Sequence, residues 1–358
     1  MSTKKYKIVK SKSIVYNGRT LYRIKALRDF NTVTGETVFK GDLGGFIETE
    51  NNLSQEGYCW IFNNAKVYDD ARVSEDAKIC GGAEIFDSAE VFGNAEISGN
   101  TQIFYGAHVC GNAKVYGYAK VCGKARVYGE AKVYNFAKIL DNAQVYDNAK
   151  IYENAIVAGD VQIYHNAQVY GNAWIYDDAF ICDNARIYGL AKIFNKAIVY
   201  GNAKVYGNAQ IFGKAKVYGN AEVYENAEIF DYAFIFGDAK VFSNAKIFGT
   251  TWLYGAAKIG DKLSLNKGKY IFATLNIDET LSEIEPICYK ISFAVRVIEL
   301  KLPIEQGYIE SLVSELAKYD ELIDYFHSNE CKIIFTPNEN KIYKLLLQSK
   351  QNIVNFYK

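Results

Sequence analysis

The sequence predicts a mainly β protein whose central part is a parallel β-helix, and three observations support this prediction. An aliphatic residue returns at every sixth position from Ile61 to Ile259, which makes 34 units of six residues. Alanine precedes almost every aliphatic residue by two positions, and small or polar turn residues follow it. All three prolines lie beyond residue 260. Such a short fixed period is typical of stacked β coils, because one unit alone cannot bury its apolar side.

Each repeat unit, with the pattern A-x-V-Y-G-N, is expected to form one short strand and one turn. The alanine and the aliphatic residue are two positions apart, so in a strand they point to the same side and form the interior. Glycine, aspartate and asparagine tolerate the positive φ angle of a tight corner. Three units make one triangular coil, and 34 units therefore predict about 11 coils in a rod roughly 50 Å long.

The two ends of the chain depart from this period and predict separate domains. Residues 1–58 are expected to form a β cap, since an open coil end exposes unpaired strands, and Asn17-Gly18 predicts a hairpin turn within it. Residues 59–260 are expected to form the β-helix. Residues 261–358 predict a C-terminal α+β domain, because apolar residues recur at helical spacing in 304–327 and again near 341–356.

The segment before the first regular coil carries a more specific pattern. Residues 41–62 read GDLGGFIETENNLSQEGYCWIF, with a GG-aromatic, an LSQ-G and a C-W-I. Together with the repeat, this segment resembles hexapeptide-repeat, left-handed parallel β-helix proteins of bacteria and prophages, a largely uncharacterised subgroup labelled as transferases by fold alone. The resemblance covers about residues 41–260 and implies a left-handed helix and a phage or prophage origin. General rules of chain handedness favour the other sense.

Composition limits the kinds of partner and site, and any site for a charged partner must be local. Lys plus Arg and Asp plus Glu are both 41, so no overall charge attracts the chain to nucleic acid or membranes. No signal peptide and no apolar stretch of membrane-spanning length is present, so a cytoplasmic location without a membrane partner is expected. The seven cysteines lack CxxC spacing, which indicates reduced thiols and no metal site.

Catalytic residues are not expected. The histidines are His108, His165 and His327, and the repeat continues in phase around the first two without a loop insertion. The wider hexapeptide class includes enzymes that transfer acyl groups from coenzyme A, using a histidine near a subunit boundary and a loop thrown out of a coil. The sequence therefore predicts no cofactor, and an acyltransferase with His108 or His165 at the edge of a cleft is kept as an alternative.

One side of the rod is expected to present a basic row beside an aromatic row, because coils of 18 residues align like positions. The residues of these rows are Lys114, Tyr116, Lys132, Tyr134, Lys150, Tyr152, Arg186, Tyr188, Lys204 and Tyr206. Cations beside aromatic rings can bind a polyanion or stack exposed bases of single-stranded nucleic acid. The same residues are also good cross-strand neighbours that keep a β surface soluble. Nucleic-acid or polyanion binding is therefore an alternative function.

Apolar residues occupy some outward positions, and exposed apolar clusters usually mark an interface. They are Ile156, Trp174, Phe180, Ile198, Phe234 and Trp252 in the strands, and Tyr118, Phe136 and Leu190 at the corners. We expect them to mediate self-association into a dimer or trimer, or docking of the C-terminal domain.

These observations together predict a non-catalytic, rigid scaffold. It would present its aromatic and basic rows and its C-terminal domain to a macromolecular partner, and the expected partner is another protein. The resemblance to prophage proteins adds the hypothesis that the partner is a host-defence factor.

Overall fold

The computed structural model describes residues 4–260 and 262–272. Within them the chain is mainly β and contains one short 3-10 helix, η1 (Glu50–Asn52). Residues up to Thr250, together with 258–266, form one compact unit, and residues 251–257 and those from Lys267 onward belong to a second. The predicted C-terminal helices lie outside the described residues.

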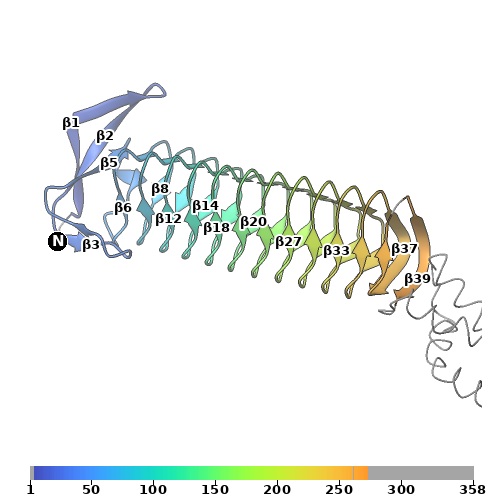
Figure 1. Ribbon diagram of the computed structural model, residues 1–358. Helices are drawn as coiled ribbons and strands as arrows, with labels where there is room; N and C mark the ends of the chain where they lie inside the picture. Colours follow the sequence, from blue (N-terminus) through green and yellow to red (C-terminus); the bar gives the residue numbers. More distant parts are fainter. Residues whose placement is uncertain (1–3, 261, 273–358) are drawn as a thin grey trace, which may run out of the picture. The chain divides into compact units, whose positions relative to one another are not determined.

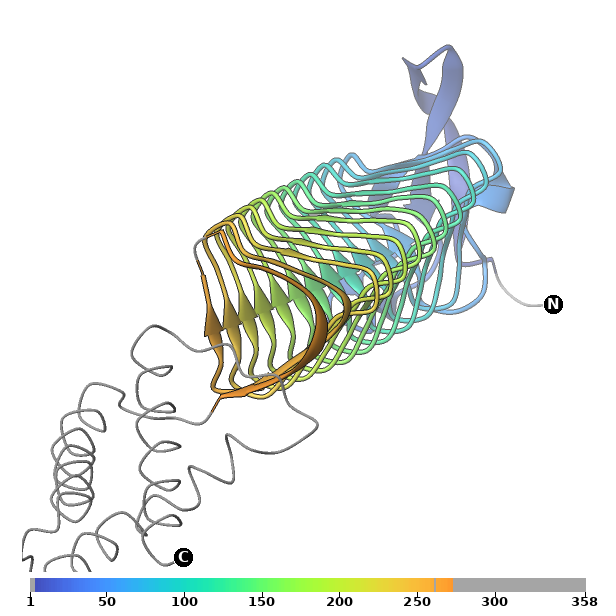
Figure 2. The ribbon, with the colours of Figure 1, turned by 90° about the vertical axis from the view of Figure 1, so that its right-hand side faces the viewer.

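The first unit is a parallel β-solenoid of about 12 turns (Figures 1 and 2). Its strands lie on three sides of the coil. Face 1 contains β7 (Lys66–Val67), β10 (Glu84–Ile85), β13 (Gln102–Ile103), β16 (Lys120–Val121), β19 (Lys138–Ile139), β22 (Ile156–Val157), β25 (Trp174–Ile175), β28 (Lys192–Ile193), β31 (Gln210–Ile211), β34 (Glu228–Ile229) and the start of β37 (Lys246–Gly255). Face 2 contains β8 (Arg72–Val73), β11 (Glu90–Val91), β14 (His108–Val109), β17 (Arg126–Val127), β20 (Gln144–Val145), β23 (Gln162–Ile163), β26 (Phe180–Ile181), β29 (Ile198–Val199), β32 (Lys216–Val217) and β35 (Phe234–Ile235). Face 3 contains β6 (Trp60–Ile61), β9 (Lys78–Ile79), β12 (Glu96–Ile97), β15 (Lys114–Val115), β18 (Lys132–Val133), β21 (Lys150–Ile151), β24 (Gln168–Val169), β27 (Arg186–Ile187), β30 (Lys204–Val205), β33 (Glu222–Val223), β36 (Lys240–Val241) and β38 (Lys258–Ile259). A last strand, β39 (Ser264–Phe272), follows.

The interior of the rod is formed as the repeat predicts. On face 3, for example, Ile151 pairs in parallel with Val133 and Val169, one coil away on either side. The aliphatic residue and the alanine of every regular unit are buried, with at most 2% of either residue exposed, as Ile151 and Ala149 illustrate. Each strand also donates backbone hydrogen bonds to the next coil, so a proline inside the repeat would interrupt the ladder.

The corners of the coils explain where acidic residues replace glycine. The corner residue that follows the aromatic position has a positive φ angle, for example 53° at Asp147 and 57° at Asp183. Its carboxylate accepts a hydrogen bond from the backbone amide of the equivalent residue one coil later: Asp147 Oδ2 is 3.2 Å from His165 N, and Asp183 Oδ2 is 3.0 Å from Gly201 N. These carboxylates therefore satisfy amides that would otherwise lack a protein acceptor.

The N-terminal strands form an antiparallel sheet that continues face 1. β1 (Tyr6–Tyr16) and β2 (Arg19–Ala26) form the predicted hairpin, with positive φ at both Asn17 and Gly18, and it projects from the end of the rod (Figure 1). β2 pairs with β5 (Leu43–Ile47), and β5 pairs in parallel with β7. A small ribbon of β3 (Phe30–Asn31) and β4 (Thr37–Val38) lies between β2 and β5 in the chain.

Parallel stacking starts before the regular period, within the segment predicted as a cap. Ile47 pairs with Val67 and Leu53 with Val73, which are offsets of 20 residues, whereas Ile61 pairs with Ile79 at the regular offset of 18. Two additional residues therefore lie between Leu53 and Ile61. This first coil adds one turn to the about 11 that the repeat predicts.

The first coil is tied to β1 by a buried lysine. Lys5 is completely buried, and its Nζ donates to the carbonyl oxygens of Glu56, Gly57 and Cys59 at 3.2, 3.3 and 3.0 Å, with Cys59 Sγ at 3.2 Å. Burial lowers the pKa of the Lys5 ammonium and raises the pKa of the Cys59 thiol. The two additional residues thus lengthen the segment between Leu53 and Ile61 into a loop. The carbonyl oxygens of this loop converge on the Lys5 ammonium.

Candidate functional site: the basic and aromatic face of the rod

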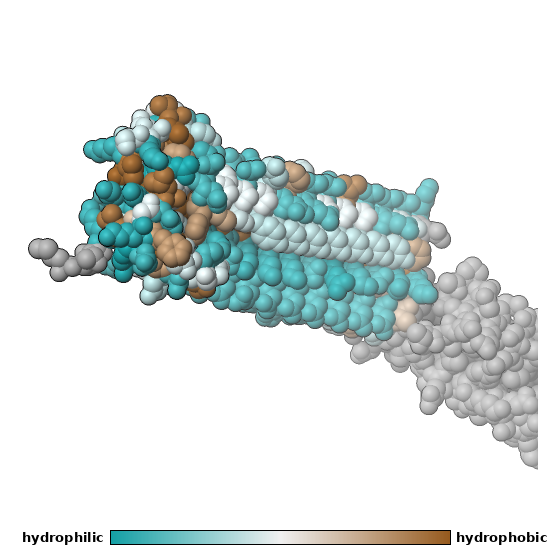
Figure 3. All heavy atoms as spheres, turned by 60° about the vertical axis from the view of Figure 1, so that its left-hand side comes forward, coloured by the Kyte–Doolittle hydropathy of each residue, from teal (hydrophilic) through white to brown (hydrophobic). Residues whose placement is uncertain are grey.

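Face 3 carries the two rows that the sequence predicts. Its outward strand positions place Lys114, Lys132, Lys150, Gln168, Arg186 and Lys204 in successive register. The aromatic row follows each buried aliphatic residue by one position. Rows of this kind run along the rod because each repeats one position of the unit, and Figure 3 shows such bands of like hydropathy. The structure brings the predicted residues together, and their role in binding stays a prediction.

The aromatic row is one continuous ring stack. From Tyr116 to Phe242, consecutive ring centroids are 4.8–5.3 Å apart and the ring planes differ by 1–9°. Both faces of each interior ring are therefore covered by its neighbours. The rings offer edges and hydroxyl groups to a ligand, and they leave no space for a nucleic-acid base to stack between them.

The hydroxyl groups of this stack are hydrogen-bond donors at neutral pH. Burial raises the pKa of Tyr152 and of Tyr206 to about 12, and neighbouring phenols and carboxylates add to the shift. A phenol in this environment stays protonated and neutral. The row can therefore donate to an anion without adding negative charge of its own.

The basic row is neutralised only towards its ends. Lys114 Nζ lies 2.6 Å from Glu96 Oε1, and Lys204 Nζ lies 3.1 Å from Glu222 Oε1. Between them, Lys132, Lys150 and Arg186 have no carboxylate oxygen within 4 Å among the residues that the structure describes. The middle of face 3 thus presents cations without an ion-pair partner beside the hydroxyl row.

A shallow polar groove lies next to this unpaired segment, along the edge between faces 2 and 3. Its volume is about 510 Å³, and its lining is Glu130, Lys132, Asn148, Lys150, Asn166 and Gln168. Asparagines recur along this edge, and the Asn166 amide donates to Asn184 Oδ1 at 3.2 Å. Apart from the carboxylate of Glu130, the groove is therefore lined by two lysines and by amide groups that can donate to an anion.

No protein-family model matches the sequence, and no curated protein matches it. Among solved structures, the chain is similar to an Arabidopsis UDP-N-acetylglucosamine acyltransferase, with a TM-score of 0.37 and 16% sequence identity over 70% of this chain and 100% of that chain. The fold is a hexapeptide-repeat β-solenoid.

The two described histidines lie on face 2 and at its corner. His108 stands in an outward row between Glu90 and Arg126, with Nδ1 3.7 Å from Glu90 Oε2. His165 is a corner residue whose side chain is 53% exposed, with Nδ1 2.9 Å from Asp183 Oδ1. The repeat continues regularly through the coils on both sides of each histidine. Neither histidine is among the residues that line the polar groove.

The predicted interface residues divide between two surfaces. Tyr118 and Phe136 stack at the corner between faces 3 and 1, 53% and 56% exposed, and the neighbouring Ile156 and Trp174 lie on face 1. On face 2, Phe180 lies next to Ile198, and Phe234 pairs with Lys216. Trp252 is exposed and belongs to the second unit, and Leu190 is an exposed corner residue. No single patch unites them.

Two further findings bear on the site. The described cysteines, Cys59, Cys80, Cys110, Cys122 and Cys182, are not in disulfides. In the same range, no three His, Cys, Asp or Glu side chains gather as metal ligands, and no helix is long and apolar enough to cross a membrane. The corner carboxylates and the Lys5 network were missed at the sequence level. A signal for the carboxylates was present, since Asp and Glu alternate with Gly at one position of the repeat.

Proposed function

We propose that this protein is a non-catalytic scaffold that binds an extended polyanion along face 3, with single-stranded nucleic acid, held by its phosphates, as the partner class. The observation that carries the proposal is the unpaired segment of the basic row, Lys132 and Lys150, beside a continuous row of tyrosine hydroxyls. Neighbouring coils are about 4.8 Å apart, so donors repeat along the rod at a short constant spacing. Charge-assisted hydrogen bonds to phosphate oxygens suit such a row.

The covered ring faces determine how such a partner is held. Because Tyr134, Tyr152 and Tyr170 already stack on one another, bases gain no stacking surface, and affinity comes from the charged backbone. We therefore expect binding to depend strongly on salt and weakly on base sequence. A phosphodiester strand without bases should compete as well as a complete strand of the same length.

The test is fluorescence anisotropy with a labelled single-stranded DNA probe across a salt series. The double variant Lys132→Gln/Lys150→Gln should weaken binding at low salt by about ten-fold and reduce the slope of log K against log salt by about 1.4, since each phosphate contact contributes about 0.7 on single strands. Removing two cations from the groove accounts for both effects.

The matched control is Lys120→Gln/Lys138→Gln on face 1. Lys120 and Lys138 are exposed, whereas Lys132 and Lys150 are half-buried. The control lysines are likewise stacked one coil apart, but Cys122 and Leu140 stand where face 3 has tyrosines. The control variant should bind like the wild type. Salt-independent binding, or equal losses in both double variants, would contradict the proposal.

Acyl transfer from coenzyme A is the second candidate, and one contact favours it. Asp183 Oδ1 lies 2.9 Å from His165 Nδ1, an arrangement in which a carboxylate orients a general base. The expected result under the scaffold proposal is no change in the melting temperature with acetyl-coenzyme A. Stabilisation by acetyl-coenzyme A that disappears in His165→Ala would instead support the enzyme.

A further inference from the structure

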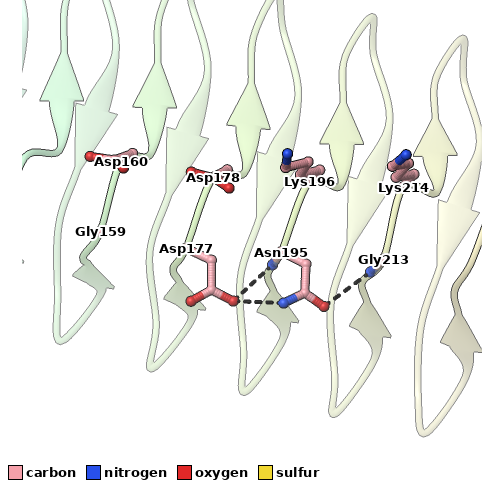
Figure 4. Close-up of a pocket in the computed structure, with 8 residues that line it drawn as sticks. All are labelled: Gly159, Asp160, Asp177, Asp178, Asn195, Lys196, Gly213 and Lys214. Carbon is pink, nitrogen blue, oxygen red and sulfur yellow. Dashed lines mark hydrogen bonds between the residues drawn. The ribbon is translucent and has the colours of Figure 1, made fainter.

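The edge between faces 1 and 2 carries a shallow depression of about 670 Å³. Its lining is Gly159, Asp160, Asp177, Asp178, Asn195, Lys196, Gly213 and Lys214, from four successive coils. Figure 4 shows the lining as two rows. In one, Asp177 Oδ2 accepts from the amide of Asn195, and Asn195 Oδ1 accepts from Gly213 N, so these groups bond along the rod. The other row contains only charged side chains.

That second row has a regular order of charge. Asp160, Asp178, Lys196 and Lys214 follow one another at 18-residue intervals, so two negative coils precede two positive coils (Figure 4). Among the described residues, neither Asp178 nor Lys196 has an ion-pair partner within 4 Å. Read in the reverse direction, the row has the opposite sign at every position, and the row is therefore complementary to a reversed copy of itself.

The adjoining outward row of face 2 has an apolar pair at the same level of the rod, where the charged row changes sign between Asp178 and Lys196. Phe180 is two residues after Asp178, Ile198 is two residues after Lys196, and the two apolar residues are strand neighbours. They lie immediately on either side of the point at which the charged row changes sign. An apolar pair thus lies beside the middle of a self-complementary charged row.

We propose that two copies of this chain pack antiparallel through this edge, with a two-fold axis that runs along the strand direction between the coils of Asp178 and Lys196. Such an axis reverses the rod direction and keeps each row opposite itself, as an isologous interface requires. Asp178 then faces Lys196 of the second copy, Asp160 faces its Lys214, and Phe180 packs on its Ile198. Each of these contacts occurs twice.

Neighbouring positions agree with this arrangement. Further along the charged row, Asn142 meets Tyr232 of the second copy, and along the apolar row Gln162 meets its Lys216. The like-charged residues Asp141 and Asp231 would meet only at the margin, where each already accepts a backbone amide within its own chain. In a parallel pair with its axis along the rod, Asp178 would face Asp178 and Lys196 would face Lys196. The charge order therefore selects the antiparallel pair.

The proposal is independent of polyanion binding because face 3 takes no part in the contact. In the resulting dimer the two copies of face 3 stay exposed and run in opposite directions. Loss of dimerisation and loss of polyanion binding are consequently separate observations.

The test is a charge-swap series of the full chain, measured by sedimentation velocity over a concentration range. Asp178→Lys and Lys196→Asp each place like charges opposite one another at two points, and each should raise the dimer dissociation constant by about ten-fold or more. The double variant Asp178→Lys/Lys196→Asp restores opposite charges across the axis and should return the dissociation constant to near the wild-type value. Phe180→Glu should also give monomers.

The control is Lys120→Asp, which changes an exposed lysine on face 1 and should leave the dimer unchanged. Circular dichroism melting of every variant shows whether it is folded. A wild-type protein that is monomeric at its highest soluble concentration, or that forms a trimer, overturns the proposal. So does a double variant that dissociates as readily as the single variants.

Discussion

Lys5→Ala should lower the free energy of unfolding by about 3 kcal/mol, because it removes a buried cation on which three carbonyl oxygens and a thiol converge. The carbonyl groups of Glu56, Gly57 and Cys59 would lose this donor in a site that is closed to bulk water. The burial that lowers the pKa of Lys5 also indicates that its ammonium is costly to desolvate, so the net loss is smaller than the sum of its hydrogen bonds. Urea denaturation of Lys5→Ala and of the wild type measures this decrease in the free energy of unfolding.

The matched control is Lys7→Ala, two residues further along the chain in β1. Lys7 is exposed and should change the unfolding free energy by less than about 0.5 kcal/mol. Limited proteolysis adds a local measurement, since the hairpin of β1 and β2 should become cleavable in Lys5→Ala before the rod does. Equal stabilities of the two alanine variants would show that the Lys5 contacts contribute nothing.

Gly57→Ala should have an effect of similar size and lower the free energy of unfolding by about 3 kcal/mol. Gly57 has a φ angle of 66°, and an added Cβ would lie 2.1 Å from the carbonyl oxygen of Glu75 and 2.8 Å from its carbon. Backbone atoms of the next coil cannot move away without breaking the ladder. The substitution therefore combines a positive-φ penalty of about 1 kcal/mol with a steric clash.

Gly18→Ala separates these two contributions. Gly18 has a φ angle of 76°, yet an added Cβ there meets nothing within 4 Å. Gly18→Ala should therefore lower the free energy of unfolding only by the conformational penalty, about 1 kcal/mol. Thermal or urea unfolding of both variants gives the difference that belongs to the clash. If the two glycines prove equally tolerant of alanine, the close approach of the first two coils at Gly57 is not a constraint.

Both substitutions affect the first coil, and this position makes them informative. In a solenoid each turn contacts only its neighbours, so the terminal turn has one neighbour fewer and depends on its cap. Lys5 and Gly57 join the cap to the first turn through the same short loop. We therefore expect destabilisation there to open the N-terminal end first.

Much of the fold could be predicted because the determining pattern is local and repeated. The spacing of Ala149 and Ile151 predicts which side is buried, and the corner positions predict positive φ. Alignment of the face 3 rows also follows from the sequence, since a period of 18 residues places Lys132 beside Lys150. The sequence did not predict that stacking covers the ring faces of the tyrosines. The sequence suggested ring faces open to bases, whereas the covered stack leaves edges and hydroxyls.

The repeat, its buried side and the rows along each face follow from the amino-acid pattern, because they depend on side-chain period and coil length alone. Other features became visible only in the folded chain. The fold shows that two additional residues shift the first coil, that Lys5 reaches carbonyl groups more than 50 positions away, and which lysines of face 3 lack an acid partner. These outcomes depend on distances between side chains on different coils, and on contacts between distant segments, which no local period encodes.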